Sequence, residues 1–327
     1  MKKVLVLGGT GLLGYHTVEE LLERGYGVKS LALPPMPADD LFSSDKVESI
    51  LANINDYSDE EILALLEDVD GLMYAIGADE RMVPEAPAYS FFYEANVLPT
   101  QRLARLAAKA GVESFVIYGS YFAEFAERID DVDLKSEAYP STRLLQEQVA
   151  FAEGEGKMRV SSLRLPYIFG SMPGRMPLWK MFADRVINQE VFPVLEGGTA
   201  AVTVKQVAQA AVGALEKGEH RGTYALGGIN ISHKEFMDRI VKALGQEETT
   251  NVPVVPLEAV MDKYRELDEQ TAAAGKEHGI HMEMNAEMNS RNLFIDPTEV
   301  MKELGYEEDD VNAAIEETLE IIKKEYE

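Results

Sequence analysis

Residues 4–14 read VLVLGGTGLLG, and this stretch decides the fold class. The apolar run at 4–7 predicts a short strand, and the apolar spacing over residues 12–24 predicts a helix that ends before Gly25. Between them, residues 9–14 match G-x-G-x-x-G, and Gly8, Gly11 and Gly14 also fit G-x-x-G-x-x-G. Glycines in such a turn permit positive φ, let the backbone approach a pyrophosphate, and aim helix N–H groups at it. We therefore predict that this strand–loop–helix unit binds a dinucleotide; a purely structural turn is the alternative.

The choice between NAD and NADP depends on the end of the second strand, which we expect over residues 28–33. Proteins that bind NAD often place an acidic residue there to bind the ribose hydroxyls, whereas an arginine nearby suits the extra phosphate of NADP. This chain has Ala32 at that position and no arginine close to it, and we interpret Asp39 and Asp40 as loop surface. Both cofactors stay open, and NAD is favoured because nothing is present to neutralise a 2′-phosphate.

Strand-like and helix-like segments alternate through the first half of the chain. This rhythm predicts right-handed crossovers and a doubly wound, Rossmann-type parallel sheet with helices on both faces, an α/β fold. We assign residues 1–165 to this dinucleotide-binding domain. The further strands are expected at 47–54, 71–76, 114–118 and 159–165, and the further helices at 59–66, 96–110 and 139–153.

After residue 165 the rhythm breaks at a loop rich in proline and glycine. We expect residues 166–327 to form mostly a smaller, C-terminal substrate-binding domain, with 199–222 as a candidate segment for a return to the first domain. Residues 257–292 are longer than a simple connection needs. Glycines and methionines in that stretch suit a mobile lid, and a surface excursion is the alternative.

Composition excludes several classes of function. The chain has 327 residues, of which 57 are acidic and 31 basic, so the formal charge is −26. This charge argues against nucleic-acid binding and against an anionic membrane surface. The absence of cysteine removes disulfides, thiolate nucleophiles and cysteine-bound metals. No apolar run approaches the roughly 20 residues of a membrane span. No signal peptide is recognisable either, and a cytoplasmic location is expected.

One histidine pattern is a candidate metal site. His278, His281 and Glu283 have a spacing that suits ligation. No third motif supports a metal, so we predict a flexible loop there and no metal site. His16, at the start of the first helix, is interpreted as a packing or capping residue.

The motifs together resemble the extended short-chain dehydrogenases/reductases, a family that includes NAD-dependent epimerases and dehydratases. The resemblance runs from Lys3 to about Thr318. The segments that carry it are the glycine loop, Asn53-Ile54-Asn55-Asp56, Val69-Asp70-Gly71 with Ala75-Ile76-Gly77, and Asn96-Val97-Leu98-Pro99-Thr100. Further along come residues 115–120, Tyr139-Pro140-Ser141-Thr142-Arg143, residues 164–170, 293–296 and 303–306.

The resemblance implies a role for individual residues. Ser120 would orient the substrate oxygen, and Tyr139 would exchange a proton while the nicotinamide exchanges a hydride. Arg143 stands four residues after the tyrosine, where the family has lysine. Pro166 and Ile168 would lie near the nicotinamide. The other implied cofactor contacts are Gly8, Thr10, Gly11, Leu12, Leu13, Gly14, Ala32, Asn53, Ile54, Ala75, Gly77 and Asn96.

The pair Tyr139 and Arg143 leaves two functions open. The free tyrosine pKa is near 10, and a cation on the same helix face lowers it. Arginine keeps the charge but has a bulkier, planar head that cannot release a proton. The first hypothesis is an NAD(P)-dependent oxidoreductase or epimerase acting on a carbonyl or alcohol. The alternative is a dinucleotide-binding or sensing protein with weak or no catalysis.

The substrate side also departs from the family. Many of its sugar-nucleotide enzymes have asparagine where Tyr167 stands, and an arginine for the diphosphate ahead of residues 202–204, where this chain has Thr199-Ala200-Ala201. Loss of that cation removes charge-assisted hydrogen bonds to a diphosphate, although Arg175, Lys180 or Arg185 are candidates to replace it. A smaller carbonyl or alcohol is an equal expectation. The helices at 96–110 and 139–153 either pair with a second copy in a homodimer or only cover the sheet.

Overall fold

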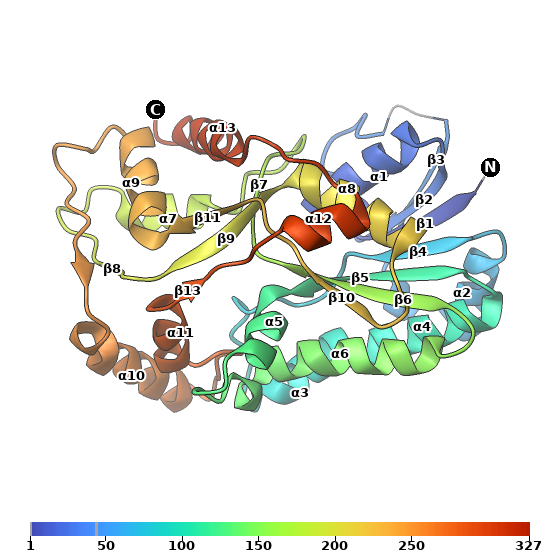
Figure 1. Ribbon diagram of the computed structural model, residues 1–327, viewed down its shortest axis with the longest axis horizontal. Coiled ribbons are helices and arrows are strands. Elements are labelled where there is room, and N and C mark those ends of the chain that lie inside the picture. The colour runs from blue at the N-terminus through green and yellow to red at the C-terminus, as the bar shows by residue number, and fades with distance from the viewer. Residues whose placement is uncertain (1, 43–44) are drawn as a thin grey trace.

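The computed structural model describes residues 2–42 and 45–327. Its largest unit is a sheet of seven parallel strands in the order β10-β6-β5-β4-β1-β2-β3 (Figure 1). The chain builds outward from β1 in one direction and then in the other, so the predicted doubly wound sheet is confirmed. The strands are β1 Lys3–Leu7, β2 Gly27–Ala32, β3 Val47–Leu51, β4 Gly71–Tyr74, β5 Ser114–Ser120, β6 Arg159–Leu165 and β10 Gly222–Ala225.

Helices cover both faces of this sheet, because alternate strand residues point to opposite faces. Val4 and Val6 of β1 belong to a buried cluster with residues of α1 and α8, whereas Leu5 and Leu7 join one with residues of α2, α4 and α6. Figure 1 shows these two helical layers above and below the strands. The helices are α1 Leu12–Glu23, α2 Asp59–Leu66, α4 Leu98–Ala110, α6 Ala138–Gly154 and α8 Val204–Lys217.

A second, smaller sheet forms the other part of the molecule. Its strands β11, β9 and β13 lie in that order, and β7 also pairs with β9. The bounds are β7 Tyr167–Phe169, β9 Gly198–Thr203, β11 Ile229–Ser232 and β13 Asn292–Leu293, while β8 Val194–Leu195 and β12 Val254–Val255 pair separately. The remaining helices are α3 Ala88–Phe92, α5 Tyr121–Arg128, α7 Lys180–Val186, α9 His233–Ala243, α10 Glu258–Ala273, α11 Met282–Asn289, α12 Thr298–Leu304 and α13 Val311–Lys323.

The segment 199–222 is divided between the two sheets. Its first residues lie in β9, in the small sheet, and α8 then packs against α1 over the large sheet. The chain next forms β10, which pairs with β6 at the edge of the large sheet. The two sheets are therefore joined by chain that crosses between them at Thr203, the residue that caps α8.

Several element boundaries differ from those expected. The third strand ends at Leu51, and the Asn53 side chain accepts a hydrogen bond from the Asn55 N–H and caps a 3-10 turn over Ile54–Asp56. The helix expected from residue 96 begins earlier, at α3, and continues through a π-helical turn, Tyr93–Val97, into α4. The fifth strand extends to Ser120, and the same residue caps α5. The sequence pattern did not indicate this helix.

No helix among the described residues is both long and apolar enough to cross a membrane.

A buried ion-pair cluster connects β6 with α5 and α6. Arg164 of β6 is 3% exposed, and its Nη2 lies 2.7 Å from Glu147 Oε2, a carboxylate that is 4% exposed. Its Nη1 lies 2.9 Å from Glu124 Oε2 and 2.7 Å from Glu127 Oε2. Each carboxylate comes from α5 or α6, so this one guanidinium fixes both helices against the sheet next to Leu165.

We predict that Arg164→Leu lowers the free energy of unfolding by about 3–5 kcal/mol, because Glu147 is then left buried without its partner. Urea denaturation of parent and variant measures the difference. Arg265→Leu is the matched control: Arg265 is 52% exposed and pairs with Asp262 and Glu283, and such exposed pairs contribute about 1 kcal/mol or less. Equal losses in the two variants would contradict the assignment of a structural role to the cluster.

Candidate functional site

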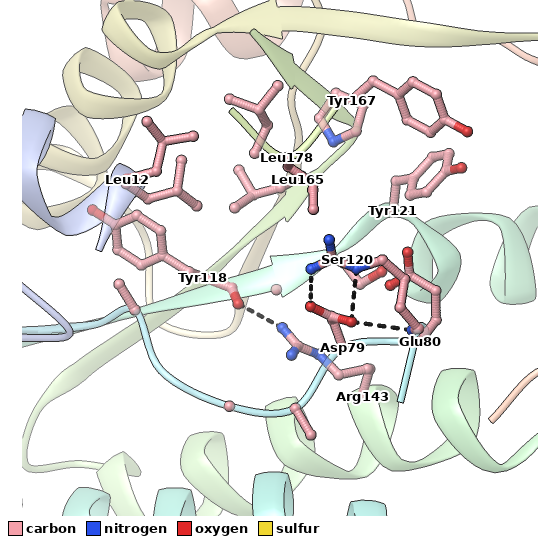
Figure 2. A pocket seen from close by; sticks show the side chains of 18 of the residues that line it. Leu12, Asp79, Glu80, Tyr118, Ser120, Tyr121, Arg143, Leu165, Tyr167 and Leu178 are labelled. Atoms are coloured by element: carbon pink, nitrogen blue, oxygen red, sulfur yellow. Dashed lines mark hydrogen bonds and ion pairs between the residues drawn. The ribbon is translucent and has the colours of Figure 1, made fainter. Parts of the chain in front are cut away.

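A cavity of about 380 Å³ lies at the carboxyl ends of the central strands, between the glycine loop and the small sheet (Figure 2). Ligands of doubly wound sheets bind at this edge. The walls come from the start of α1, the loop after β4, the end of β5, the start of α6 and the segment after β6. The lining residues used below are Leu12, Leu13, Ala75, Gly77, Asp79, Glu80, Arg81, Tyr118, Ser120, Tyr121, Tyr139, Arg143, Pro166, Tyr167, Ile168, Leu178 and Trp179.

The glycine loop forms one end of this cavity region. Gly8 has φ +84°, and a Cβ there would lie 2.4 Å from the Ala75 carbonyl oxygen. A Cβ on Gly14 would lie 2.1 Å from the Gly8 carbonyl oxygen, so the loop folds against the first turn of α1 with no space for side chains. Gly11 precedes α1 and offers no side-chain cap. The free N–H groups of that turn fit an anionic pyrophosphate.

A loop from the second half of the chain crosses over the glycine loop. Arg175 Nε donates a hydrogen bond of 3.2 Å to the Thr10 carbonyl oxygen, and His16 Nε2 lies 2.8 Å from the Ser171 carbonyl oxygen. The backbone at Gly174 approaches Pro37 so closely that a Cβ would lie 2.0 Å from its carbonyl oxygen. Arg175 is one candidate to replace the family's diphosphate-binding arginine. The structure places it beside the predicted cofactor loop.

Asn96 hydrogen-bonds to the loop after β4 from the side that faces away from the cavity. It is fully buried, its Oδ1 accepts a hydrogen bond of 2.8 Å from the Ala78 N–H, and its Nδ2 donates one of 3.0 Å to the Ala78 carbonyl. Gly77 has φ +143°, and a Cβ there would lie 2.6 Å from Asn96 Oδ1. Asn96 therefore holds the cavity wall and does not line the cavity.

The structure brings together many of the residues that the resemblance implied. Leu12, Leu13, Ala75, Gly77, Pro166 and Ile168 line the cavity with Ser120, Tyr139 and Arg143, and Gly8, Thr10, Gly11 and Gly14 form the adjoining loop. Besides Asn96, three implied cofactor contacts lie outside both the cavity and the loop. Ala32 ends β2 and is 6% exposed, Ile54 is buried in the core, and Asn53 caps its 3-10 turn.

Tyr139 is buried in the wall, with 3% of its surface exposed. Burial raises its pKa to about 12, and the charges of Glu80 and Asp79 add to that rise, while the Arg143 cation and the Ser120 hydroxyl act in the opposite direction. Its phenol is therefore protonated at neutral pH. The ring packs edge-on against Phe92.

Arg143 approaches Tyr139 from the next turn of α6. Its Cζ lies 5.7 Å from the centre of the Tyr139 ring, and Nη2 donates a hydrogen bond to the Tyr118 carbonyl oxygen (Figure 2). The side chain is 6% exposed, and its Nε is buried with no hydrogen-bond partner in the described structure. A buried donor of this kind is costly unless a ligand satisfies it, so this atom fits a bound group with an acceptor oxygen.

Ser120 ends β5 and caps α5. Its Oγ accepts a hydrogen bond of 3.2 Å from the Phe122 N–H. Because the oxygen is the acceptor in this cap, the hydroxyl proton is left to donate elsewhere. The Ser120 hydroxyl and the Tyr139 phenol thus form two donors on the same wall of the cavity.

Sequence reasoning missed the charged residues that follow β4. Arg81 Nε lies 2.9 Å from Asp79 Oδ1, and its Nη2 pairs with the other oxygen of the same carboxylate. Glu80 lies between them in the chain, and burial, followed by the charge of Asp79, raises its pKa. One feature of the sequence could have indicated them: they follow shortly after a central strand, at the sheet edge where ligands bind.

The stretch 275–281 braces the start of α6. The Gly279 carbonyl accepts a hydrogen bond of 2.7 Å from the Tyr139 N–H, and the His281 N–H donates one of 2.7 Å to Glu137 Oε2. A Cβ on Gly279 would lie 2.5 Å from the Phe92 ring. This part of the expected lid is thus fastened directly behind Tyr139.

The histidines weighed as metal ligands have carboxylate partners. His278 Nδ1 lies 3.1 Å from Asp268 Oδ1, and His281 Nδ1 lies 2.9 Å from Glu137 Oε2. Glu283 lies in the first turn of α11 and ion-pairs with Arg265, so the expected loop is partly helical. Within residues 2–42 and 45–327, no group of three or more metal-ligating side chains has suitable geometry.

Comparison with known proteins now gives the family. The model of the NAD dependent epimerase/dehydratase family matches residues 4–227. Mouse sterol-4-alpha-carboxylate 3-dehydrogenase, decarboxylating, is 24% identical over 269 residues, covering 75% of this chain and 70% of the relative.

Two solved structures show the same fold. The Bordetella bronchiseptica enzyme WbmH in complex with NAD+ superposes with a TM-score of 0.69 at 18% identity, covering 97% of this chain and 96% of that one. UDP-glucose 4-epimerase from Thermotoga maritima does so with a TM-score of 0.71 at 17% identity, covering 99% and 100%. The predicted Rossmann-type fold is confirmed, and the family's name agrees with the preference for NAD. The chain belongs to the NAD-dependent epimerase/dehydratase family and is an enzyme of that class.

Proposed function

We propose that this enzyme transfers a hydride between NAD and a compact alcohol or carbonyl substrate, as an oxidoreductase or epimerase, with Tyr139 as the acid/base. The observation that carries the proposal is the meeting of Tyr139, Arg143 and Ser120 on one wall of a cavity that adjoins the glycine loop. The cavity volume of about 380 Å³ suits a small ligand.

The residues present fit a dinucleotide. The backbone of residues 8–14 would hold the pyrophosphate, because α1 begins after Gly11 without a side-chain cap and its first N–H groups can donate to an anion. Ala75, Gly77, Pro166 and Ile168 would lie along the nicotinamide end, and the unpartnered Arg143 Nε would donate to an oxygen of the ribose. When bound, the nicotinamide supplies the hydride acceptor or donor.

The proton chemistry follows from the state of Tyr139. A buried phenol with a pKa of about 12 is protonated at neutral pH and can donate to a carbonyl oxygen that is being reduced. In the oxidative direction the phenol must first lose its proton, and the Arg143 cation stabilises the phenolate. The Ser120 hydroxyl donates to the same substrate oxygen and orients it.

The walls favour a small alcohol or ketone over a nucleotide sugar. Thr199, Ala200 and Ala201 are buried within β9, so this strand presents no cation for a diphosphate. Tyr121, Tyr167, Leu178 and Trp179 make the substrate end largely aromatic and apolar. The mouse relative, a sterol dehydrogenase by name, supports the same class of reaction.

We predict that Tyr139→Phe lowers kcat/KM for alcohol oxidation by about 10²- to 10⁴-fold, because only the hydroxyl that accepts the substrate proton is removed. The assay follows nicotinamide absorbance with NAD+ and a panel of small secondary alcohols. NAD+ binding, measured by calorimetry, is expected to persist. Tyr89→Phe, at an exposed tyrosine, is the control and should leave the rate unchanged. An unchanged rate in Tyr139→Phe would contradict the acid/base role, and NAD+ binding by a parent chain that turns over nothing would favour the sensing alternative.

The pH dependence of alcohol oxidation provides a second prediction. The rate should rise with pH between about pH 6 and pH 10, because the base is the deprotonated phenol and burial holds its pKa high. Arg143→Gln removes the cation that lowers this pKa, so the rising limb of log kcat/KM should move to higher pH. Arg143→Lys keeps a cation and should keep the limb near its original position. Superimposable profiles for parent and Arg143→Gln would show that Arg143 does not act on Tyr139.

A further inference from the structure

Glu80 is the one charged side chain of the cavity wall that forms neither an ion pair nor a hydrogen bond with another residue of the described structure. Asp79 and Arg81 pair with each other, and Arg143 donates to the Tyr118 carbonyl. Glu80 forms no ion pair and no side-chain hydrogen bond with another described residue. Figure 2 shows it beside Ser120 at the substrate end of the cavity, below Tyr121.

Three phenol groups lie within electrostatic reach of this carboxylate. Burial raises the pKa of Tyr121, Tyr139 and Tyr167, and in each case the negative charge of Glu80 contributes to the rise. Glu80 and these three tyrosines all line the same cavity, which places the carboxylate close to the proposed acid/base.

The rings around that space form an aromatic wall. Tyr121 and Tyr167 are in edge-to-face contact with ring centres 6.4 Å apart, and Tyr167 packs on Trp179 with ring centres 4.6 Å apart. Aromatic faces attract cations, and such walls recognise ammonium groups in other proteins. Tyr121, Tyr167 and Trp179 all line the cavity, so this aromatic wall borders a bound ligand.

A carboxylate among apolar rings is unfavourable unless a partner of opposite charge compensates its loss of hydration. The Arg81 and Arg143 cations act on Glu80 only as neighbouring charges, and its carboxylate hydrogen-bonds to its own backbone N–H. No described residue forms an ion pair with it, so a direct partner is expected from the ligand. Resting on the proposed function, we propose that the substrate carries a protonated amine or quaternary ammonium group close to its reacting carbon, as in an amino alcohol or amino ketone. Glu80 would receive the cation while Ser120 and Tyr139 hold the oxygen. The net charge of −26 also concentrates cations around the protein.

The chain contains its own reporter for this site. Trp179 is the only tryptophan in the sequence and lines the cavity, so its fluorescence responds to occupancy. The NAD+-saturated enzyme is titrated with choline and with its uncharged isostere 3,3-dimethylbutan-1-ol. We expect choline to bind at least about tenfold more tightly, and Glu80→Gln to remove that preference. Glu80→Asp should retain part of it. Glu85→Gln, at an exposed glutamate of the same loop, should not change it.

Activity gives an independent comparison. 1-Aminopropan-2-ol and butan-2-ol differ only by an ammonium in place of a methyl group, and kcat/KM should favour the amine in the parent but not in Glu80→Gln. Equal affinity for choline and its isostere, an undiminished preference in Glu80→Gln, or no fluorescence response to either probe would overturn the proposal. Choline binding that depends on Glu80 without oxidation of any alcohol would support it while refuting the proposed hydride transfer. Unchanged thermal melting and NAD+ affinity in Glu80→Gln verify that the variant is folded.

Discussion

The site depends on the close contact between the Gly8 carbonyl and the first turn of α1. A Cβ on Gly14 would lie 2.1 Å from that oxygen, and one on Gly8 would lie 2.4 Å from the Ala75 carbonyl oxygen. These contacts join β1, α1 and the loop after β4 at a single point. Because the same loop carries Gly77, Asp79 and Glu80 onward into the cavity, the packing of the glycine loop also sets the position of the substrate end. Asn96 secures this arrangement by bonding both backbone groups of Ala78.

The second constraint is the burial of Tyr139. Removing a phenol from water favours its neutral form, and here burial outweighs the opposing effect of Arg143. The tyrosine is fixed from behind by the Gly279 carbonyl and edge-on by Phe92, so its hydroxyl has little freedom to leave the wall. Arginine in the lysine position keeps a charge near the ring. Its Nη2 donates to the Tyr118 carbonyl, and its buried Nε has no partner among the described residues.

Local patterns predicted the large sheet well because each of its units is a contiguous strand, turn and helix. The doubly wound parallel arrangement and the position of the glycine loop followed from that alternation, and the i, i+4 spacing placed Tyr139 and Arg143 on one helix face. The small sheet was not predictable in the same way. Its strands are β7, β9, β11 and β13. They are short and far apart in the chain, so their pairing is set by tertiary packing. The end of β3 was missed because the Asn53 cap, a side-chain interaction, overrides the apolar pattern.

The candidate site shows the same division. Residues within recognisable motifs line the cavity, whereas Glu80 and Trp179 belong to irregular segments that carry no periodic signal. Asn96 was placed near the cofactor by resemblance, but it acts through the loop that it holds, a role visible only in three dimensions. The segment 257–292 contacts the start of α6 through Gly279 and His281. These residues are far from α6 in the sequence, so local patterns could not predict the contacts.

The central claim is that the glycine loop binds NAD and thereby places its reactive ring beside Tyr139. Isothermal titration of the folded chain with NAD+, followed by NADP+, tests it most directly. The account predicts saturable binding of one NAD+ per chain, with weaker binding of NADP+ because the sequence has no arginine close to Ala32 to receive the extra phosphate. A folded chain that binds neither dinucleotide would contradict the account.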